Sequence, residues 1–172
     1  MPHDNNHGKI APCLWFDHEA EEAARYYTSI FKNSKMGEIA RYGEAGKEIH
    51  GQKPGSVMVV DFELDGQPFT ALNGGPQFKF NEAVSLQIYC DTQQEIDYYW
   101  DKLSKGGDPA AQQCGWLKDK YGVSWQVTPT VLKELVKDQK SEAGQRAMNA
   151  MMQMKKIDIG EIKRAYEGRN AA

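Results

Sequence analysis

The side chains that could bind a ligand in this sequence lie at alternate positions in two short segments. Residues 85–90 alternate polar side chains with Leu, Ile and Cys, and residues 123–128 alternate them with Val and Trp. Successive side chains of a strand point to opposite faces, so each segment would carry one apolar and one polar face. The polar faces either meet solvent, as in many antiparallel sheets, or line a binding site. The polar side chains are those of Ser85, Gln87, Tyr89, Ser124, Gln126 and Thr128.

The segment that follows residue 72 holds a second group of candidates. Asn73-Gly74-Gly75-Pro76 has the composition of a turn. A phosphate cradle would need a helix N-terminus after the glycines, and none is predicted there. Phe78 and Phe80 flank a lysine, and we expect them to cover the rim of a binding site or a partner subunit.

Three further residue types could take part in chemistry. Trp15, Trp116 and Trp125 could stack on a planar ligand, although tryptophans are more often core residues. Cys114 has no neighbouring base in the sequence, so a buried structural thiol is favoured over a nucleophile. The acidic residues within 17–22 are explained by the start of a helix, where negative charge is favourable. No residue is therefore assigned a catalytic role.

The elements of the first half of the chain follow the order strand, helix, strand, strand, strand. Asp17 is expected to be the N-cap of the helix, which then carries apolar residues at helical spacing. Asp65-Gly66 is a hairpin signal between the last two strands. The expected strands are residues 9–16, 35–42, 57–64 and 67–72, with a loop at 43–55.

The same order is repeated in the second half of the chain. A strand leads into a helix that begins with Thr92 and Glu95 as a capping box and stops at Gly106-Gly107. The expected strands are residues 84–90, 112–114, 116–120 and 123–128. A block of this length that occurs twice indicates two similar modules, residues 9–76 and 84–128.

The C-terminal part, residues 129–168, is predicted to be a helical extension. Thr128 can cap a first helix, with Pro129 at its first position. Ser141 opens a second helix and Asp158 opens a last short one. The second helix carries methionines that we interpret as core or subunit-contact surface. These are Met148, Met151, Met152 and Met154.

The composition excludes two classes of partner. The 172 residues are 40% hydrophobic and carry a net charge of −3, which offers no basic surface for nucleic acid. The longest aliphatic run, residues 57–60, is far too short to span a membrane. Residues 1–8 have no apolar signal core and are expected to be a disordered tail. Three cysteines, odd in number and far apart, suit reduced thiols, so we expect a cytoplasmic protein.

Three long stretches of the sequence carry a specific resemblance. They are PCLWFDHEAEEAARYYTSIF, LNGGPQFKFNEAVSL and CGWLKDKYGVSWQVTP. Together with the duplicated module they resemble the vicinal oxygen chelate superfamily, which includes glyoxalase I, bleomycin-resistance proteins and extradiol dioxygenases. The similarity is greatest to its PhnB-like branch, whose members are often labelled 3-demethylubiquinone-9 3-methyltransferase. This resemblance implies an α+β fold in which two βαβββ modules form a half-open mixed β-cup, followed by the helical extension.

The resemblance also implies four positions at which metal-dependent members of the superfamily place their ligands. The first strand of module one has Pro12 there, or Cys13 if the register moves by one residue, and the last strand has Asn73. The corresponding positions of module two hold Ser85 and Gln126. Hydroxyl and amide oxygens are poor ligands for transition metals, so we expect no metal and no other cofactor.

Two alternatives to metal-free binding stay open. A metal-dependent lyase, isomerase or dioxygenase would need other ligands, such as Cys13 with Glu63 or Asp61. A methyltransferase of the common type would need a strand, a glycine-rich turn and a helix in sequence, and Gly74-Gly75 is not followed by a helix. We expect a homodimer that binds a small molecule. The residues expected to bind it are Gln126, Gln87, Ser85, Tyr89, Asn73, Ser124, Trp116 and Phe78.

Overall fold

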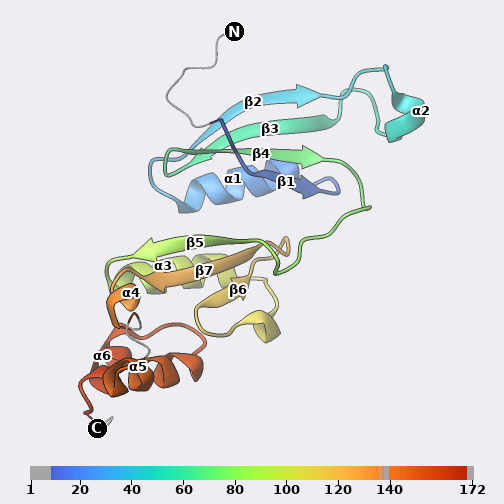
Figure 1. Cartoon of the computed structure of the whole chain (residues 1–172). Coiled ribbons are helices and arrows are strands. Elements are labelled where there is room, and N and C mark those ends of the chain that lie inside the picture. The colour runs from blue at the N-terminus through green and yellow to red at the C-terminus, as the bar shows by residue number, and fades with distance from the viewer. Residues whose placement is uncertain (1–8, 136, 138–139, 170–172) are drawn as a thin grey trace. The chain divides into compact units, whose positions relative to one another are not determined.

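The computed structural model describes residues 9–135, 137 and 140–169, so the tail expected at residues 1–8 lies outside the described residues. The chain forms two compact units, Met1–Lys79 and Phe80–Ala172, which we call unit 1 and unit 2. Each unit contains one small, open, mixed sheet with a helix packed against it (Figure 1). The predicted α+β class, with two mixed sheets and a helical C-terminal region, is confirmed.

Unit 1 is a four-stranded sheet with one long helix on one of its faces. Its elements are β1 (Cys13–Phe16), α1 (Ala20–Ile30), β2 (Lys35–Arg41), α2 (Lys47–His50), β3 (Val57–Leu64) and β4 (Gln67–Asn73). The strand order is β1-β4-β3-β2, in which β1 is parallel to β4 and the other pairs are antiparallel. α1 packs against β3 and β4 (Figure 1).

The core of unit 1 follows from the alternation of β3 and the helical spacing of α1. Val60, Phe62 and Leu64 are buried, while the residues between them are exposed or half-buried. The Tyr27 ring of α1 stacks on Phe62 at a centroid distance of 6.4 Å, and Phe62 stacks on Phe69 at 5.3 Å. Burying each large apolar side chain contributes about 1.5–3 kcal/mol, so the helix and the sheet stabilise each other.

The N-terminus of α1 is not capped by Asp17, the residue that was predicted to cap it. Glu19, and not Asp17, occupies the N-cap position, and its side chain accepts no capping hydrogen bond. The side-chain oxygen of Asn73, at the end of β4, accepts from the backbone N–H of Ala20 at 2.8 Å. A residue more than fifty positions away in the sequence therefore supplies the cap that a local residue was expected to supply.

Two other predictions for unit 1 need correction. β1 begins at Cys13 and not at residue 9, because the ladder with β4 starts only there. The loop expected at residues 43–55 contains the short helix α2. Gly46 and Gly51 flank α2 with positive φ, a conformation that glycine adopts without steric cost.

Unit 2 begins with a three-stranded sheet and one helix. Its elements are β5 (Ser85–Cys90), α3 (Gln93–Ser104), a short 3-10 helix η1 (Pro109–Ala111), β6 (Trp116–Lys118) and β7 (Ser124–Pro129). The strand order is β5-β7-β6, in which β5 is parallel to β7 and β6 is antiparallel to it. The capping box of Thr92 and Glu95 at the start of α3 is confirmed. Ile96, Trp100 and Leu103 of α3 are buried.

The strand predicted at residues 112–114 does not join this sheet. It forms only one isolated bridge, to Trp116. Cys114 and Gly115 both have positive φ, which interrupts an extended chain. Their backbone N–H groups donate to the carbonyl oxygens of residues 154–155 at 2.8 Å each. The segment therefore pairs with the C-terminal part of the chain, and the second sheet has three strands where four were predicted.

The described part of the chain after β7 is helical. Its helices are α4 (Leu132–Leu135), α5 (Glu142–Met152) and α6 (Ile159–Tyr166). The prediction that Thr128 and Pro129 begin a helix is wrong, because both residues continue β7 and pair with β5. Ser141 and Asp158 cap α5 and α6 through their side chains, as predicted. Within residues 9–135, 137 and 140–169, no helix combines the length and apolar character needed to cross a membrane.

Candidate functional site

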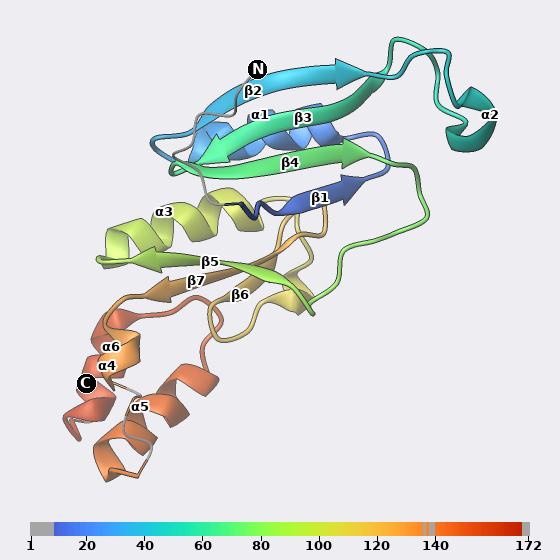
Figure 2. The same cartoon turned by 45° about the horizontal axis from the view of Figure 1, so that its top comes forward.

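The predicted polar residues of unit 2 lie on one face of its sheet. In the parallel pairing of β5 and β7, Ser85 lies opposite Ser124 and Gln87 lies opposite Gln126, while Trp116 of β6 pairs with Gln126 from the other side. The alternate residues of these strands face α3, which covers the opposite side of the sheet (Figure 2). We call the following residues the polar face: Ser85, Gln87, Tyr89, Trp116, Ser124, Gln126 and Thr128.

A chain of hydrogen bonds runs across the polar face. The Tyr89 hydroxyl donates to Gln87 Oε1 at 2.9 Å, and Gln87 Nε2 donates to Gln126 Oε1 at 3.4 Å. Gln126 Nε2 in turn donates to Ser85 Oγ at 2.8 Å. All four side chains are neutral hydrogen-bonding groups, and each bond orients the next amide. Gln126, which is half-buried, lies at the centre of this chain.

Ser124 differs from its neighbours on the polar face because its hydroxyl is enclosed. The residue is 2% exposed, and its Oγ has no hydrogen-bond partner within the described part of the chain. A buried polar group without a partner costs about 1–3 kcal/mol. Lys118, the β6 residue that pairs with Ser124, forms an ion pair with Glu82. The serine hydroxyl is therefore an unused hydrogen-bonding group beside a charged pair.

Two aromatic rings add flat apolar surface to the polar face. Trp116 is half-buried next to Gln126. Tyr89 is 49% exposed, and the Lys133 ammonium lies 4.4 Å from the centroid of its ring. A cation at this distance is attracted by the ring electrons, so Lys133 helps to fix the tyrosine.

Asn73 lies in unit 1 and has structural partners at both ends of its amide. Its oxygen accepts from Ala20, and its Nδ2 donates to the Val57 carbonyl oxygen at 3.1 Å. The side chain is buried. These bonds tie β4 to β3 and to the start of α1. The binding role expected for Asn73 stays a prediction.

Phe78, also in unit 1, is 65% exposed and lies edge-on to Trp15 at a centroid distance of 4.9 Å. The Trp15 indole N–H donates to the Gly75 carbonyl oxygen at 2.9 Å. Its ring passes so close to Gly74 that a Cβ there would overlap the indole. The Gly-Gly pair thus makes room for Trp15, which agrees with its interpretation as a turn. The part of Phe78 in ligand binding stays a prediction.

Two of the alternative metal ligands of unit 1, Cys13 and Asp61, lie in one row across its sheet, and Glu63 lies two residues further along β3. Cys13 pairs with Thr70 on β4, and Thr70 pairs with Asp61 on β3 and donates to it at 3.1 Å. Burial, and then the nearby Asp61 carboxylate, raise the pKa of the Cys13 thiol, which favours the protonated form. Glu63 forms an ion pair with Lys35. In the described ranges of the chain, no three His, Cys, Asp or Glu side chains gather as metal ligands.

Sequence reasoning missed the charged groups beside the polar face. Lys118 shares a face with Trp116, so the alternation of β6 could have identified it. Glu82 and Lys133 lie outside the strands, and no periodic signal points to them. Asp119 was also missed: it is buried, and its Oδ2 accepts from the Trp125 indole N–H at 2.8 Å.

Comparison with known proteins gives one family and several similar structures. A family model described as 3-demethylubiquinone-9 3-methyltransferase matches residues 8–128. The PhnB protein from Bacillus cereus is 39% identical, with 72% of this chain and 100% of that chain covered and a TM-score of 0.61. A Pseudomonas aeruginosa protein, 17% identical over 71% of this chain and 97% of its own, has a TM-score of 0.54 and shows the fold alone. No curated protein matches this chain.

Proposed function

Since this chain belongs to the family described as 3-demethylubiquinone-9 3-methyltransferase, through residues 8–128, we propose that it binds a small organic molecule on the polar face without a metal ion. The PhnB protein from Bacillus cereus, 39% identical, supports the resemblance to the vicinal oxygen chelate superfamily, which includes proteins that bind small molecules. The identity of the family does not by itself fix the chemistry, because one fold hosts many functions. The proposal therefore depends on the residues of this chain.

The observation that carries the proposal is the hydrogen-bonded chain centred on Gln126. Here a neutral chain joins two strands, from the Tyr89 hydroxyl to Ser85 Oγ. Beside it, the enclosed Ser124 hydroxyl has no partner within the described residues. A few fixed polar groups next to aromatic surface are typical of small-molecule sites.

The chemistry of the polar face favours an organic ligand over a metal centre. By the resemblance, Gln126 and Ser85 correspond to two of the four positions where the superfamily places metal ligands, and both are neutral. Neutral amide and hydroxyl oxygens compete poorly with water for zinc, nickel or iron. The same groups donate and accept hydrogen bonds, and Trp116 offers a flat ring. We therefore propose a ring-containing ligand with hydrogen-bonding substituents.

Methyl transfer from S-adenosylmethionine is not part of this proposal, despite the description of the family. The strand β1 leads into α1 through Asp17, His18 and Glu19, without a glycine. Gly74 and Gly75 follow β4 and lead into a connector without a helix. Isothermal titration with S-adenosylmethionine should detect no binding at micromolar protein. Micromolar affinity would overturn this part of the proposal.

The proposal is tested with a library of small ring-containing compounds and a matched pair of variants. Compounds that raise the melting temperature of the wild-type protein are titrated against Gln126→Leu and Gln67→Leu. Gln67 is an exposed glutamine of β4 whose side chain donates to the adjacent Pro68 carbonyl at 3.4 Å. Gln126→Leu should weaken binding about ten-fold or more, which corresponds to one lost hydrogen bond of about 1.4 kcal/mol. Equal affinity for both variants would refute a site at Gln126.

A further inference from the structure

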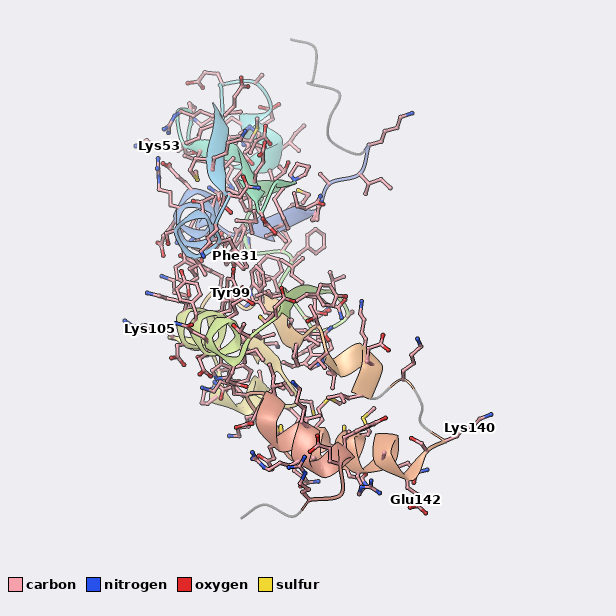
Figure 3. The ribbon with its side chains drawn as sticks, turned by 90° about the vertical axis from the view of Figure 1, so that its left-hand side faces the viewer. Phe31, Lys53, Tyr99, Lys105, Lys140 and Glu142 are labelled. Atoms are coloured by element: carbon pink, nitrogen blue, oxygen red, sulfur yellow. The ribbon has the colours of Figure 1, made fainter. Side chains whose placement is uncertain are left out.

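The methionines near the C-terminus do not all serve as core. Met154 is buried, and its sulfur accepts from the backbone N–H of Asp158 at 3.5 Å. Met152, the last residue of α5, is 51% exposed. Figure 3 shows sulfur atoms beside the helix that starts at the labelled Glu142. Core packing therefore explains the position of Met154 but not that of Met152, whose thioether lies at the surface.

A second sulfur lies next to this thioether. Cys114 Sγ is 3.7 Å from Met152 Sδ, and the thiol S–H donates to the thioether. Gln113 Nε2 donates to the Met152 carbonyl oxygen at 2.7 Å and to Cys114 Sγ at 3.4 Å. The backbone N–H of Cys114 donates to the Met154 carbonyl oxygen at 2.8 Å. Hydrogen bonds from Gln113 and from the Cys114 backbone thus hold the two sulfur-bearing segments together, although Cys114 and Met152 are 38 residues apart in the sequence.

We propose that Cys114 and Met152 form a binding site for a soft monovalent metal ion of the Cu(I) class. A thiolate and a thioether are the soft ligands that select Cu(I) over harder ions. Zinc needs three or four thiolate, imidazole or carboxylate ligands, and no such group of three occurs among the residues that the structure describes. The site shares no residue with the polar face and does not depend on the function proposed above.

The existing geometry suits such an ion without moving the sulfurs. Metal–sulfur bonds of about 2.3 Å across a separation of 3.7 Å give an angle of about 107° at the metal. That bent arrangement leaves coordination positions for water or a small ligand. The ion takes the place of the proton in the S–H···S hydrogen bond. The cysteine releases one proton to solvent, a metal–sulfur bond forms, and no atom changes its oxidation state.

The other two cysteines of the chain provide the controls. Cys90 is fully buried, and burial raises the pKa of its thiol to about 12, with smaller contributions from Glu95 and Asp91. Cys13 is exposed and lies in unit 1, next to Thr70 rather than a thioether. A metal ion that binds any accessible thiol would also bind at Cys13.

The test is an anaerobic titration with Cu(I) supplied as its bathocuproine disulfonate complex, which loses colour as the protein takes the metal. Wild-type protein should bind one equivalent, Cys114→Ser should lose this site, and Met152→Leu should weaken it about ten-fold or more. Cys13→Ser and Met148→Leu should bind as the wild type does. X-ray absorption of the loaded protein should report two sulfur ligands.

Two outcomes would overturn the proposal. One is equal affinity of wild type and Met152→Leu, which would mean that the thioether is not a ligand. The other is loss of the high-affinity equivalent in Cys13→Ser. Circular dichroism checks that each variant is folded. Met152→Leu keeps the size and apolar character of the side chain, so we expect it to fold. The Met152→Leu titration therefore still tests the proposal if Cys114→Ser fails to fold.

Discussion

Replacing Trp125 with Ala should destabilise unit 2 far more than replacing its neighbour Gln126 with Leu. Trp125 is 2% exposed and lies on the face of β7 that packs toward α3. Removing such a ring costs about 3–5 kcal/mol. The Asp119 carboxylate, also buried, loses the indole N–H that now donates to it at 2.8 Å, which adds about 1–3 kcal/mol. The total of about 4–8 kcal/mol is comparable with the whole stability of a small domain.

Gln126→Leu removes hydrogen bonds whose other partners can reach water. Gln87 is exposed and Ser85 is half-buried, so water replaces the lost amide. We expect the free energy of unfolding to change by no more than about 1 kcal/mol. Urea denaturation followed by far-ultraviolet circular dichroism measures both variants. Trp125→Phe, which keeps an aromatic ring but lacks the N–H, should fall between them.

The ranking of these variants tests which face of β7 is the core. If Gln126→Leu is more destabilising than Trp125→Ala, the assignment of the two faces is inverted. If Trp125→Phe costs as much as Trp125→Ala, the hydrogen bond to Asp119 contributes more to stability than the packing of the ring. The larger share assigned above to packing would then be wrong.

Four other outcomes can be measured on the same protein. Asn73→Ala should lower the free energy of unfolding by about 2–4 kcal/mol, because the Ala20 N–H and the Val57 carbonyl lose their partner. Urea denaturation measures this loss, and a loss no larger than that of the exposed control Gln67→Ala would contradict the prediction. Burial raises the pKa of the Cys90 thiol from its ordinary 9.0 to about 12, so its stabilising effect is complete below about pH 9 and is lost as the pH rises toward 12. The melting temperature of the wild type should therefore fall relative to Cys90→Ala in that window, whereas a constant difference from pH 8 upward would refute the linkage. Light scattering should give the mass of a homodimer that Met148→Lys weakens, and a monomeric wild type at micromolar concentration would count against subunit contacts by the C-terminal helices. Protein without an affinity tag should contain well under one equivalent of zinc, nickel or iron, and a chelator-induced fall in melting temperature would favour the metal-dependent alternative.

The elements that depend on local chemistry could be predicted from the sequence. β3 runs over Val57–Leu64, as its alternation predicts, because the face that packs into the core is apolar throughout. Thr92, Ser141 and Asp158 cap the helices that follow them, since the donor and the acceptor lie within one turn. The same local alternation predicted that the polar residues of β5 and β7 each share a face.

The features that could not be predicted depend on contacts between distant segments. Asn73 caps α1 only because β4 lies beside β1, and no local pattern indicates that contact. Residues 112–114 leave the sheet because residues 154–155 offer backbone acceptors. At the candidate site, alternation identified Gln126, but its bond to Ser85 needs the register of β5 against β7. The enclosure of Ser124 likewise follows from the fold and not from its own strand.

The central claim, that a small organic molecule binds to the polar face without a metal, is tested most directly by nuclear magnetic resonance. Uniformly ¹⁵N-labelled protein, treated with a chelator, is titrated with the small-molecule fraction of a cell extract. We predict shifts of the side-chain amides of Gln87 and Gln126 and of the Trp116 indole N–H, with the Gln67 amide unchanged. Shifts confined to other residues, shifts that need an added divalent metal, or an unchanged spectrum would contradict the claim.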